Sequence, residues 1–220
     1  MEYNIVGDIA GCHNTLMALI AKMPKCKVLA VGDLIDRGPK SKEVVEFFMS
    51  NPQHIVLKGN HEHLMLNECR NGSVYEFGMW MINGGLQTLK SYGLAVPQIT
   101  PHGTMTNIPQ SVLKWVDSLP LYFETDDLFV SHSFVYPRHT LENALDIDSR
   151  WNQDYNIIWS REFPGRTNKY QIAGHNSHWG LRRFSDSQGE FALGIDTSKQ
   201  KVLTGIHWPS RVIYQQPYID

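Results

Sequence analysis

The amino-acid sequence predicts an α/β fold, because apolar stretches alternate with helical patterns over the first 60 residues. The apolar stretches, typical of buried strands, are residues 3–7, 25–31 and 54–58. One helical pattern covers residues 14–22, and Pro39 and Pro52 bound a second one that is rich in valine and phenylalanine. Strands and helices that alternate with short connections predict a right-handed parallel unit whose loops gather at one end.

The remainder of the chain predicts a helical cap followed by further strands, so we expect mixed sheets. Residues 62–92 have a helical pattern that is broken at Gly72 and at Gly84-Gly85, which indicates a cap beside the gathered loops. Residues 93–107 are rich in proline, glycine and threonine, and they predict a loop. The later elements are predicted as a helix over 110–118, a hairpin over 121–131, a short helix over 141–145, a strand over 170–173 and antiparallel strands over 181–184, 190–195, 201–206 and 211–215.

Length and composition narrow the class of protein. A chain of 220 residues with no visible linker predicts a single domain over residues 1–220. The net charge is −2 and like charges form no block, which argues against binding to nucleic acid or to a membrane surface. The three cysteines have no CxxC spacing, so neither a disulfide framework nor a structural zinc site is expected. Without a signal sequence or a membrane span, we expect a cytoplasmic protein.

Residues 32–38, Gly-Asp-Leu-Ile-Asp-Arg-Gly, carry the most chemistry in the chain. They follow the second predicted strand, so their charged side chains fall at the carboxyl end of a sheet, where open α/β folds bind ligands. Asp33 can offer one oxygen to each of two cations, and Arg37 can form a bidentate contact with a phosphate. This segment therefore predicts a site for a phosphorylated ligand.

Side chains with metal-binding atoms follow several other predicted strands. They are Asp8, Asp33, Asn60, His132 and His175. A single such residue is usually a cap or a satisfied polar group, but five of them at successive strand ends favour one metal centre. Mixed oxygen and nitrogen ligands suit borderline divalent ions such as Mn²⁺, Fe²⁺ or Zn²⁺.

The same segments resemble the signatures of the metal-dependent serine/threonine phosphoprotein phosphatases, most closely the bacteriophage lambda and bacterial type. The matching segments are Gly7–Gly11, Gly32–Gly38, Gly59–Glu62, Val130–His132, Trp159–Arg161 and Gly174–His175. The resemblance covers essentially the whole chain. It implies a four-layer α/β/β/α metallophosphoesterase sandwich that hydrolyses phosphoserine and phosphothreonine, with phosphotyrosine as a further candidate. Phosphorylated proteins or peptides would be the partners of a monomeric enzyme.

The resemblance also implies a role for each matching residue. Asp33 would bridge two divalent ions, with Mn²⁺ the first candidate. Asp8 would help to hold the first ion, and the second would be held by Asn60, His132 and His175. Arg37 and Arg161 would grip the phosphoryl oxygens. His61, oriented by Asp36, would protonate the leaving oxygen, while a metal-bound hydroxide attacks phosphorus directly.

One position departs from the family pattern. The first signature ordinarily reads Asp-x-His, and Ala10 stands where the histidine would ligate the first ion. Alanine cannot ligate, so we expect weak occupancy of that site and reduced activity. His13 begins a predicted helix that points elsewhere and is not expected to compensate.

Two other functions remain open at this stage. A symmetrical dinucleoside tetraphosphate hydrolase would share the scaffold and the metals, although such enzymes tend to have alanine at the position of Asp36. A non-catalytic phosphopeptide-binding protein is suggested by Ala10. Three other residues have ordinary explanations: Glu62 as a helix-start residue that fixes the turn, and Phe77 and Trp80 as packing groups of the cap.

Overall fold

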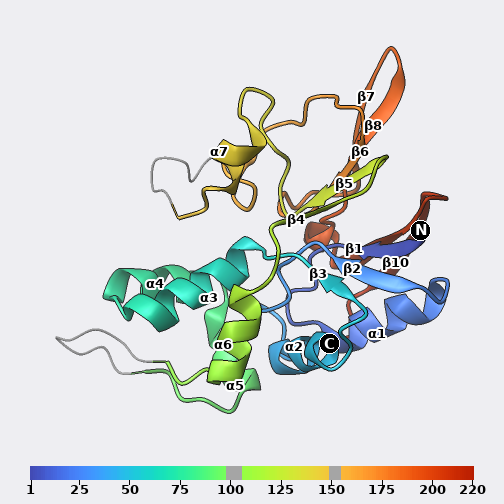
Figure 1. Cartoon of the computed structure of the whole chain (residues 1–220). Helices are drawn as coiled ribbons and strands as arrows, with labels where there is room; N and C mark the ends of the chain where they lie inside the picture. Colours follow the sequence, from blue (N-terminus) through green and yellow to red (C-terminus); the bar gives the residue numbers. More distant parts are fainter. Residues whose placement is uncertain (98–105, 149–154) are drawn as a thin grey trace.

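Two five-stranded sheets stack face to face in the computed structural model, which describes residues 1–97, 106–148 and 155–220 (Figure 1). The first sheet has the order β10-β9-β1-β2-β3. Its strands are β1 (Tyr3–Val6), β2 (Lys27–Ala30), β3 (Ile55–Val56), β9 (Val202–Trp208) and β10 (Val212–Pro217). The second sheet has the order β4-β5-β6-β8-β7. Its strands are β4 (Tyr122–Glu124), β5 (Leu128–Ser131), β6 (Tyr170–Ala173), β7 (Arg182–Asp186) and β8 (Gly189–Gly194).

Both sheets are mixed, as the sequence predicts. Strands β1, β2 and β3 are parallel, while β9 and β10 join them in antiparallel pairs. In the second sheet β5, β6 and β8 are parallel, and β4 and β7 are antiparallel edge strands. The prediction of one antiparallel set at the end of the chain is therefore wrong in part. Alternation identifies strands but not their partners, and these four strands divide between the two sheets, with β8 parallel to β6.

The facing sides of the two sheets form one apolar core. Ile5 and Leu29 from the first sheet meet Val130, Ile172 and Leu193 from the second, and all five are fully buried. Because successive side chains of a strand point to opposite faces, Phe129 leaves this core and lies on the outer side of the second sheet. The core holds the two sheets in a fixed relation, so the loops at their carboxyl ends lie together.

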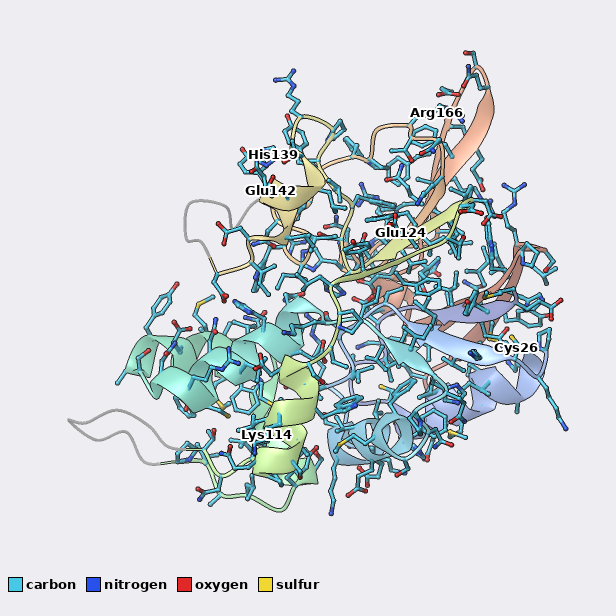
Figure 2. All side chains as sticks on the ribbon, in the orientation of Figure 1. Cys26, Lys114, Glu124, His139, Glu142 and Arg166 are labelled. Carbon is cyan, nitrogen blue, oxygen red and sulfur yellow. The ribbon has the colours of Figure 1, made fainter. Side chains whose placement is uncertain are left out.

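Helices cover the outer faces and give the predicted four layers. α1 (His13–Lys22) and α2 (Ser41–Met49) bury their apolar sides against the first sheet, with Leu19 and Val45 fully buried. The short helix α7 (Leu141–Leu145) and residues 155–159 cover part of the second sheet, where Ile157 packs near Tyr122 and Phe129. Figure 2 shows side chains filling the spaces between these layers. The predicted α/β sandwich is thus confirmed.

The predicted helical cap is also confirmed. It consists of α3 (Asn60–Asn71), α4 (Val74–Ile82) and α5 (Gly85–Ser91), with α6 (Gln110–Asp117) beside α3. The chain turns at Gly72 and Gly84, which both adopt positive φ angles that favour glycine. The loop predicted over 93–107 lies largely outside the described residues. A short 3₁₀ helix covers Ser198–Gln200, and no helix in the described ranges is long and apolar enough to cross a membrane.

Candidate metal centre

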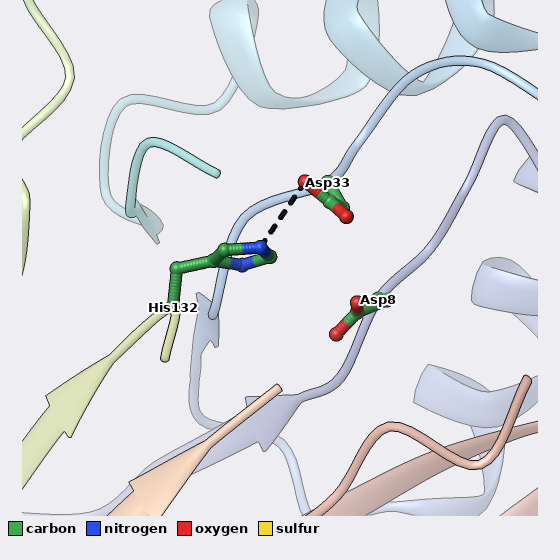
Figure 3. A group of neighbouring side chains, drawn as sticks. All are labelled: Asp8, Asp33 and His132. Atoms are coloured by element: carbon green, nitrogen blue, oxygen red, sulfur yellow. Dashed lines mark ion pairs between the residues drawn. The ribbon is translucent and has the colours of Figure 1, made fainter. Parts of the chain in front are cut away.

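Three predicted ligands meet at the carboxyl ends of the central strands. Asp8 follows β1, Asp33 follows β2 and His132 follows β5, so the fold brings together residues that lie far apart in the sequence. One ligand atom from each lies within 4.8 Å of the others, and all three residues are buried (Figure 3). Within this group, His132 Nε2 lies 3.3 Å from Asp33 Oδ1.

Asn60 and His175 complete the predicted set. The side-chain oxygen of Asn60 lies 2.9 Å from His132 Nε2 and 2.9 Å from His175 Nδ1. The backbone N–H of His175 donates to Asp8 Oδ2 at 3.1 Å. The structure therefore brings together all five residues that the sequence predicts as ligands.

The hydrogen bonds of the two imidazoles show which of their nitrogens can bind a cation. His132 Nδ1 lies 3.0 Å from the carbonyl oxygen of Val31, and His175 Nε2 lies 3.1 Å from that of Trp159. A carbonyl oxygen can only accept, so each ring donates from that nitrogen and, in its neutral form, points a lone pair from the other toward Asn60 Oδ1. Lone pairs that face an amide oxygen and a carboxylate repel one another unless a cation lies between them, so the donor set fits a divalent metal ion.

The electrostatics of the cluster favour the same interpretation. Burial lowers the pKa of His132 despite the nearby charge of Asp33. Burial and the neighbouring His132 lower the pKa of His175 to about 3, so both rings are neutral near pH 7. Burial raises the pKa of Asp8 well above its usual value, and the carboxylates of Asp196 and Asp33 raise it further. A cation would relieve this repulsion between carboxylates.

Next to Asp8, position 10 supplies no metal-ligand atom, as expected for alanine. The methyl group of Ala10 is buried and offers no ligand atom, although its N–H donates to the carbonyl of Asp33 at 2.8 Å. Its φ of 49° is unusual for a residue with a side chain. The ring of His13 packs near Phe47, 6.5 Å between centroids, which agrees with the expectation that it does not compensate.

Asp196 is a nearby carboxylate that the sequence analysis missed. It is 3% exposed, and its backbone oxygen accepts from the N–H of His178. It comes two residues after β8 ends at Gly194, so the signal that identified the other carboxylates, a polar residue just after a strand, also applied here. It is not one of the three residues whose ligand atoms meet within 4.8 Å, so we treat it as a neighbour of the centre.

A strained loop presents Asp33 and the residues that follow it. Asp33, Asp36 and Arg37 all have positive φ angles, between 51° and 70°. Glu62 holds this loop: Oε2 accepts from the backbone N–H groups of Asp33 and Gly59 at 2.8 and 2.9 Å, and Oε1 accepts from Leu34. Burial and the charge of Asp33 raise the pKa of Glu62 to about 7. The prediction that Glu62 fixes the turn at the start of α3 is confirmed.

Asp33 lies so close to position 59, just before Asn60, that this position requires glycine. A Cβ at this position would come 2.3 Å from Asp33 Oδ1 and 2.5 Å from the backbone nitrogen of Asp33. Only glycine leaves room for the carboxylate in its present place.

The predicted pair of Asp36 and His61 is present and fully enclosed. His61 Nδ1 lies 2.6 Å from Asp36 Oδ2, and both side chains are almost completely buried. Burial alone would lower the pKa of His61, but the carboxylates of Asp33 and Asp36 raise it. Arg37 Nη2 donates to His61 Nε2 at 2.9 Å, so in this arrangement the ring proton is on Nδ1, facing Asp36.

Two cap residues hold Asp36, and the sequence analysis did not identify either as part of the site. Trp80 packs in the core as predicted, but its indole N–H also donates to Asp36 Oδ1 and Oδ2 at 3.0 and 3.1 Å. The hydroxyl of Thr88 donates to Asp36 Oδ1 at 2.6 Å and accepts from the backbone N–H of Asp36 at 2.9 Å. A buried tryptophan usually finds an acceptor for its N–H, which was the available signal.

The two arginines predicted to grip phosphate lie at the exposed rim of this buried cluster. Arg37 and Arg161 are both exposed. Arg161 Nη1 lies 3.4 Å from Asn176 Oδ1, which places the guanidinium in the loop beside His175. Two exposed cations beside buried carboxylates and imidazoles can hold an anion over the metal-binding atoms.

A buried oxygen and nitrogen ligand set, with guanidinium groups at its rim and at the strand ends of a two-sheet sandwich, defines a metal-dependent phosphoesterase. The model of the calcineurin-like phosphoesterase family matches residues 1–199. The chain belongs to this family. Divalent metal ions are therefore the expected cofactors, and the ligand set above has the chemistry to hold them.

Similar proteins include nucleotide hydrolases and a protein phosphatase. Over 170 residues the chain is 29% identical to the symmetrical bis(5'-nucleosyl)-tetraphosphatase of Vibrio campbellii, covering 74% of this chain and 55% of that protein. Over 85 residues it is 36% identical to serine/threonine-protein phosphatase 2 of Escherichia coli, covering 37% of each. The chain thus spans about half the length of the first of these relatives.

A solved structure supports the fold. The crystal structure of a putative diadenosine tetraphosphatase superposes with a TM-score of 0.65 at 18% identity, and the match covers 100% of this chain and 95% of that one. At this level of identity the likeness concerns the fold alone.

Proposed function

We propose that this chain hydrolyses dinucleoside polyphosphates, the alternative that the sequence analysis left open. The observation that carries the proposal is the set of lone pairs that converge on the centre between Asp33, Asn60 and the two imidazoles. The similarity to a bis(5'-nucleosyl)-tetraphosphatase extends over more of the chain than the similarity to a protein phosphatase, and it favours a phosphoanhydride as substrate.

The residues of this chain would divide the work as follows. Asp8 and Asp33 would hold one divalent ion, and Asp33, Asn60, His132 and His175 the other. The bound ions would polarise the phosphoryl group and supply a nucleophile at neutral pH. Arg37 and Arg161 would orient the phosphate chain from the rim. Asp36 would support a positive charge on His61.

Arg37 links substrate binding to the state of His61. In this structure its guanidinium donates a hydrogen bond to His61 Nε2 at 2.9 Å. When Arg37 turns toward a phosphate, Nε2 becomes free to carry a proton, and the carboxylates that raise the pKa of His61 favour that proton. His61 could then donate it to the leaving oxygen.

A phosphoprotein phosphatase is the second candidate, and the pair of Asp36 and His61 favours it. An alkoxide such as that of serine leaves poorly without a proton, whereas a nucleoside di- or triphosphate leaves easily. The buried contact of 2.6 Å between His61 and Asp36, which Trp80 and Thr88 hold in place, is suited to protonating an alkoxide. The resemblance to the bacteriophage lambda and bacterial phosphatases belongs with this candidate.

A direct comparison of substrates tests the proposal. Purified protein loaded with Mn²⁺ is given diadenosine tetraphosphate, and separately a phosphoserine peptide, and the products are separated by chromatography. We expect diadenosine tetraphosphate to be cleaved with the higher kcat/KM, and its products identify the bond: two diphosphates for symmetrical cleavage, a mono- and a triphosphate for asymmetrical cleavage. A higher kcat/KM for the peptide would support the second candidate instead.

A binding protein without catalysis is the third outcome. It would bind the phosphopeptide and turn over neither substrate, even after Ala10→His. Metal content, measured by mass spectrometry after dialysis, shows separately whether one or two ions are held per chain.

A further inference from the structure

A large cavity lies between the cap and the second sheet, next to the metal centre. Its volume is about 1120 Å³, which exceeds the usual range for small-molecule sites. One wall comes from α3 and α4, and the opposite wall from residues 147–148 and the segment 155–162. Figure 1 shows these two parts facing each other across the left side of the molecule.

The cavity borders the candidate metal centre through residues that contact its predicted ligands. Its lining includes Trp159 and Arg161. The ring of Trp159 meets that of His175 edge to face, 6.0 Å between centroids, and the Trp159 carbonyl accepts from His175 Nε2 at 3.1 Å. Along α3 the lining runs from His63, three residues after the ligand Asn60, to Asn71, which is about 12 Å at 1.5 Å per residue.

Two tyrosines offer aromatic surface in this cavity. Tyr75 on α4 is 65% exposed, and Tyr155 on the opposite wall is 37% exposed. The ring of Tyr155 is held in place by stacking on His139, with 5.1 Å between centroids and 25° between planes. His139 is labelled beside α7 in Figure 2. A ring fixed in this way can stack on a flat ligand at little entropic cost.

The lining of the cavity carries charges of both signs. Arg161 stands at the end that meets the metal centre. The lining also carries carboxylates, which are Glu76, Asp148 and Glu162. Glu76 lies on α4 next to Tyr75, away from the metal ligands, where a second phosphate would be repelled but hydroxyl groups would find acceptors.

We propose that this cavity binds the nucleoside of the substrate, with the base on Tyr75 and Tyr155 and the ribose hydroxyls near the carboxylates. The phosphate chain then passes Arg161 to reach the metal centre. The inference rests on the proposed function, and it names the part of the molecule that recognises the leaving nucleotide.

The test compares two substrates in matched variants. Tyr75→Ala and Tyr155→Ala each remove an aromatic face, and the matched control is Ile82→Ala, which is on the same helix as Tyr75, 84% exposed and outside the lining. Loss of a stacking contact with a base should lower kcat/KM for diadenosine tetraphosphate by roughly tenfold, mostly through KM. Hydrolysis of p-nitrophenyl phosphate, which has no nucleoside, should stay within about twofold, and Ile82→Ala should change neither substrate.

A binding measurement separates this inference from the proposed function. Affinity for adenosine diphosphate is measured by calorimetry on the Mn²⁺-loaded wild type and on both tyrosine variants. If the wild type binds it, the variants bind it roughly tenfold more weakly and no dinucleotide is cleaved, the cavity assignment stands and the proposed function fails. If the dinucleotide is cleaved and the variants behave as the wild type in both measurements, the cavity assignment is overturned. Equal losses on both substrates, or a wild type that does not bind adenosine diphosphate, also overturn it.

Discussion

The sandwich and the cap contribute to the site in different ways. The sandwich supplies the predicted metal ligands, and backbone carbonyls of Val31 and Trp159 fix the orientation of two of them. The cap supplies no predicted ligand beyond Asn60 at its first residue, but Trp80 and Thr88 hold the pair of Asp36 and His61. Changes at the ligands of the sandwich should therefore affect every substrate. Changes at the pair of Asp36 and His61, or at the cap residues that hold it, should depend on the leaving group.

The largest effect is expected from Asp33→Asn. The amide would remove the charge between the two ion positions, so turnover of every substrate should fall by more than about a hundredfold, together with Mn²⁺ affinity. Calorimetric titration with Mn²⁺ and kcat measurements check this. Asp186→Asn is the control, because that exposed carboxylate pairs with Arg166 on the surface. Retention of normal metal binding in Asp33→Asn would contradict the bridging role.

Asp36→Asn should separate substrates by their leaving groups. The neutral amide can no longer support a positive charge on His61, so hydrolysis of a phosphoserine peptide should fall by about a hundredfold. Cleavage of diadenosine tetraphosphate, whose leaving group needs little protonation, should fall by less than about tenfold. The two kcat values are compared at equal metal saturation. An equal fall on both substrates would show that Asp36 acts on the metal centre rather than on the acid.

Ala10→His should strengthen the poorer side of the centre. Histidine tolerates positive φ better than most residues, and the added imidazole should raise Mn²⁺ affinity about 10–100-fold, with activity rising alongside. Ala10→Gly is the matched control, since it relieves the φ of 49° without adding a donor. If both variants gain equally, backbone strain and not ligation limits the native chain.

Trp80→Phe should have the smallest effect. The ring continues to pack, but Asp36 loses one of its donors, which should lower the free energy of unfolding by about 1–3 kcal/mol. Turnover of the phosphoserine peptide should fall by no more than about tenfold, because Thr88 still donates to Asp36. Thermal unfolding and kcat are measured on the same samples. A loss of Mn²⁺ affinity in this variant would contradict the view that the cap residues hold Asp36 and His61 and do not affect metal binding.

The sequence was informative where chemistry follows a strand directly. Asp8, Asp33 and His132 were found because parallel strands bring their carboxyl ends to one edge, and the structure places them within 4.8 Å. Trp80 and Thr88 were missed because their acceptor, Asp36, lies 44 and 52 residues away, across a turn whose geometry no local pattern predicts. The cavity beside Arg161 could not be predicted from the sequence either, because its walls come from segments that only tertiary packing brings together.

The close approach of Gly59 to Asp33 has a consequence for mutational surveys of this chain. Any larger side chain at position 59 would push directly on the carboxylate oxygen, at 2.3 Å. In a saturation scan that scores activity, substitutions at position 59 should therefore be as poorly tolerated as substitutions of Asp33. Yet the side chain of Gly59 is only a hydrogen atom.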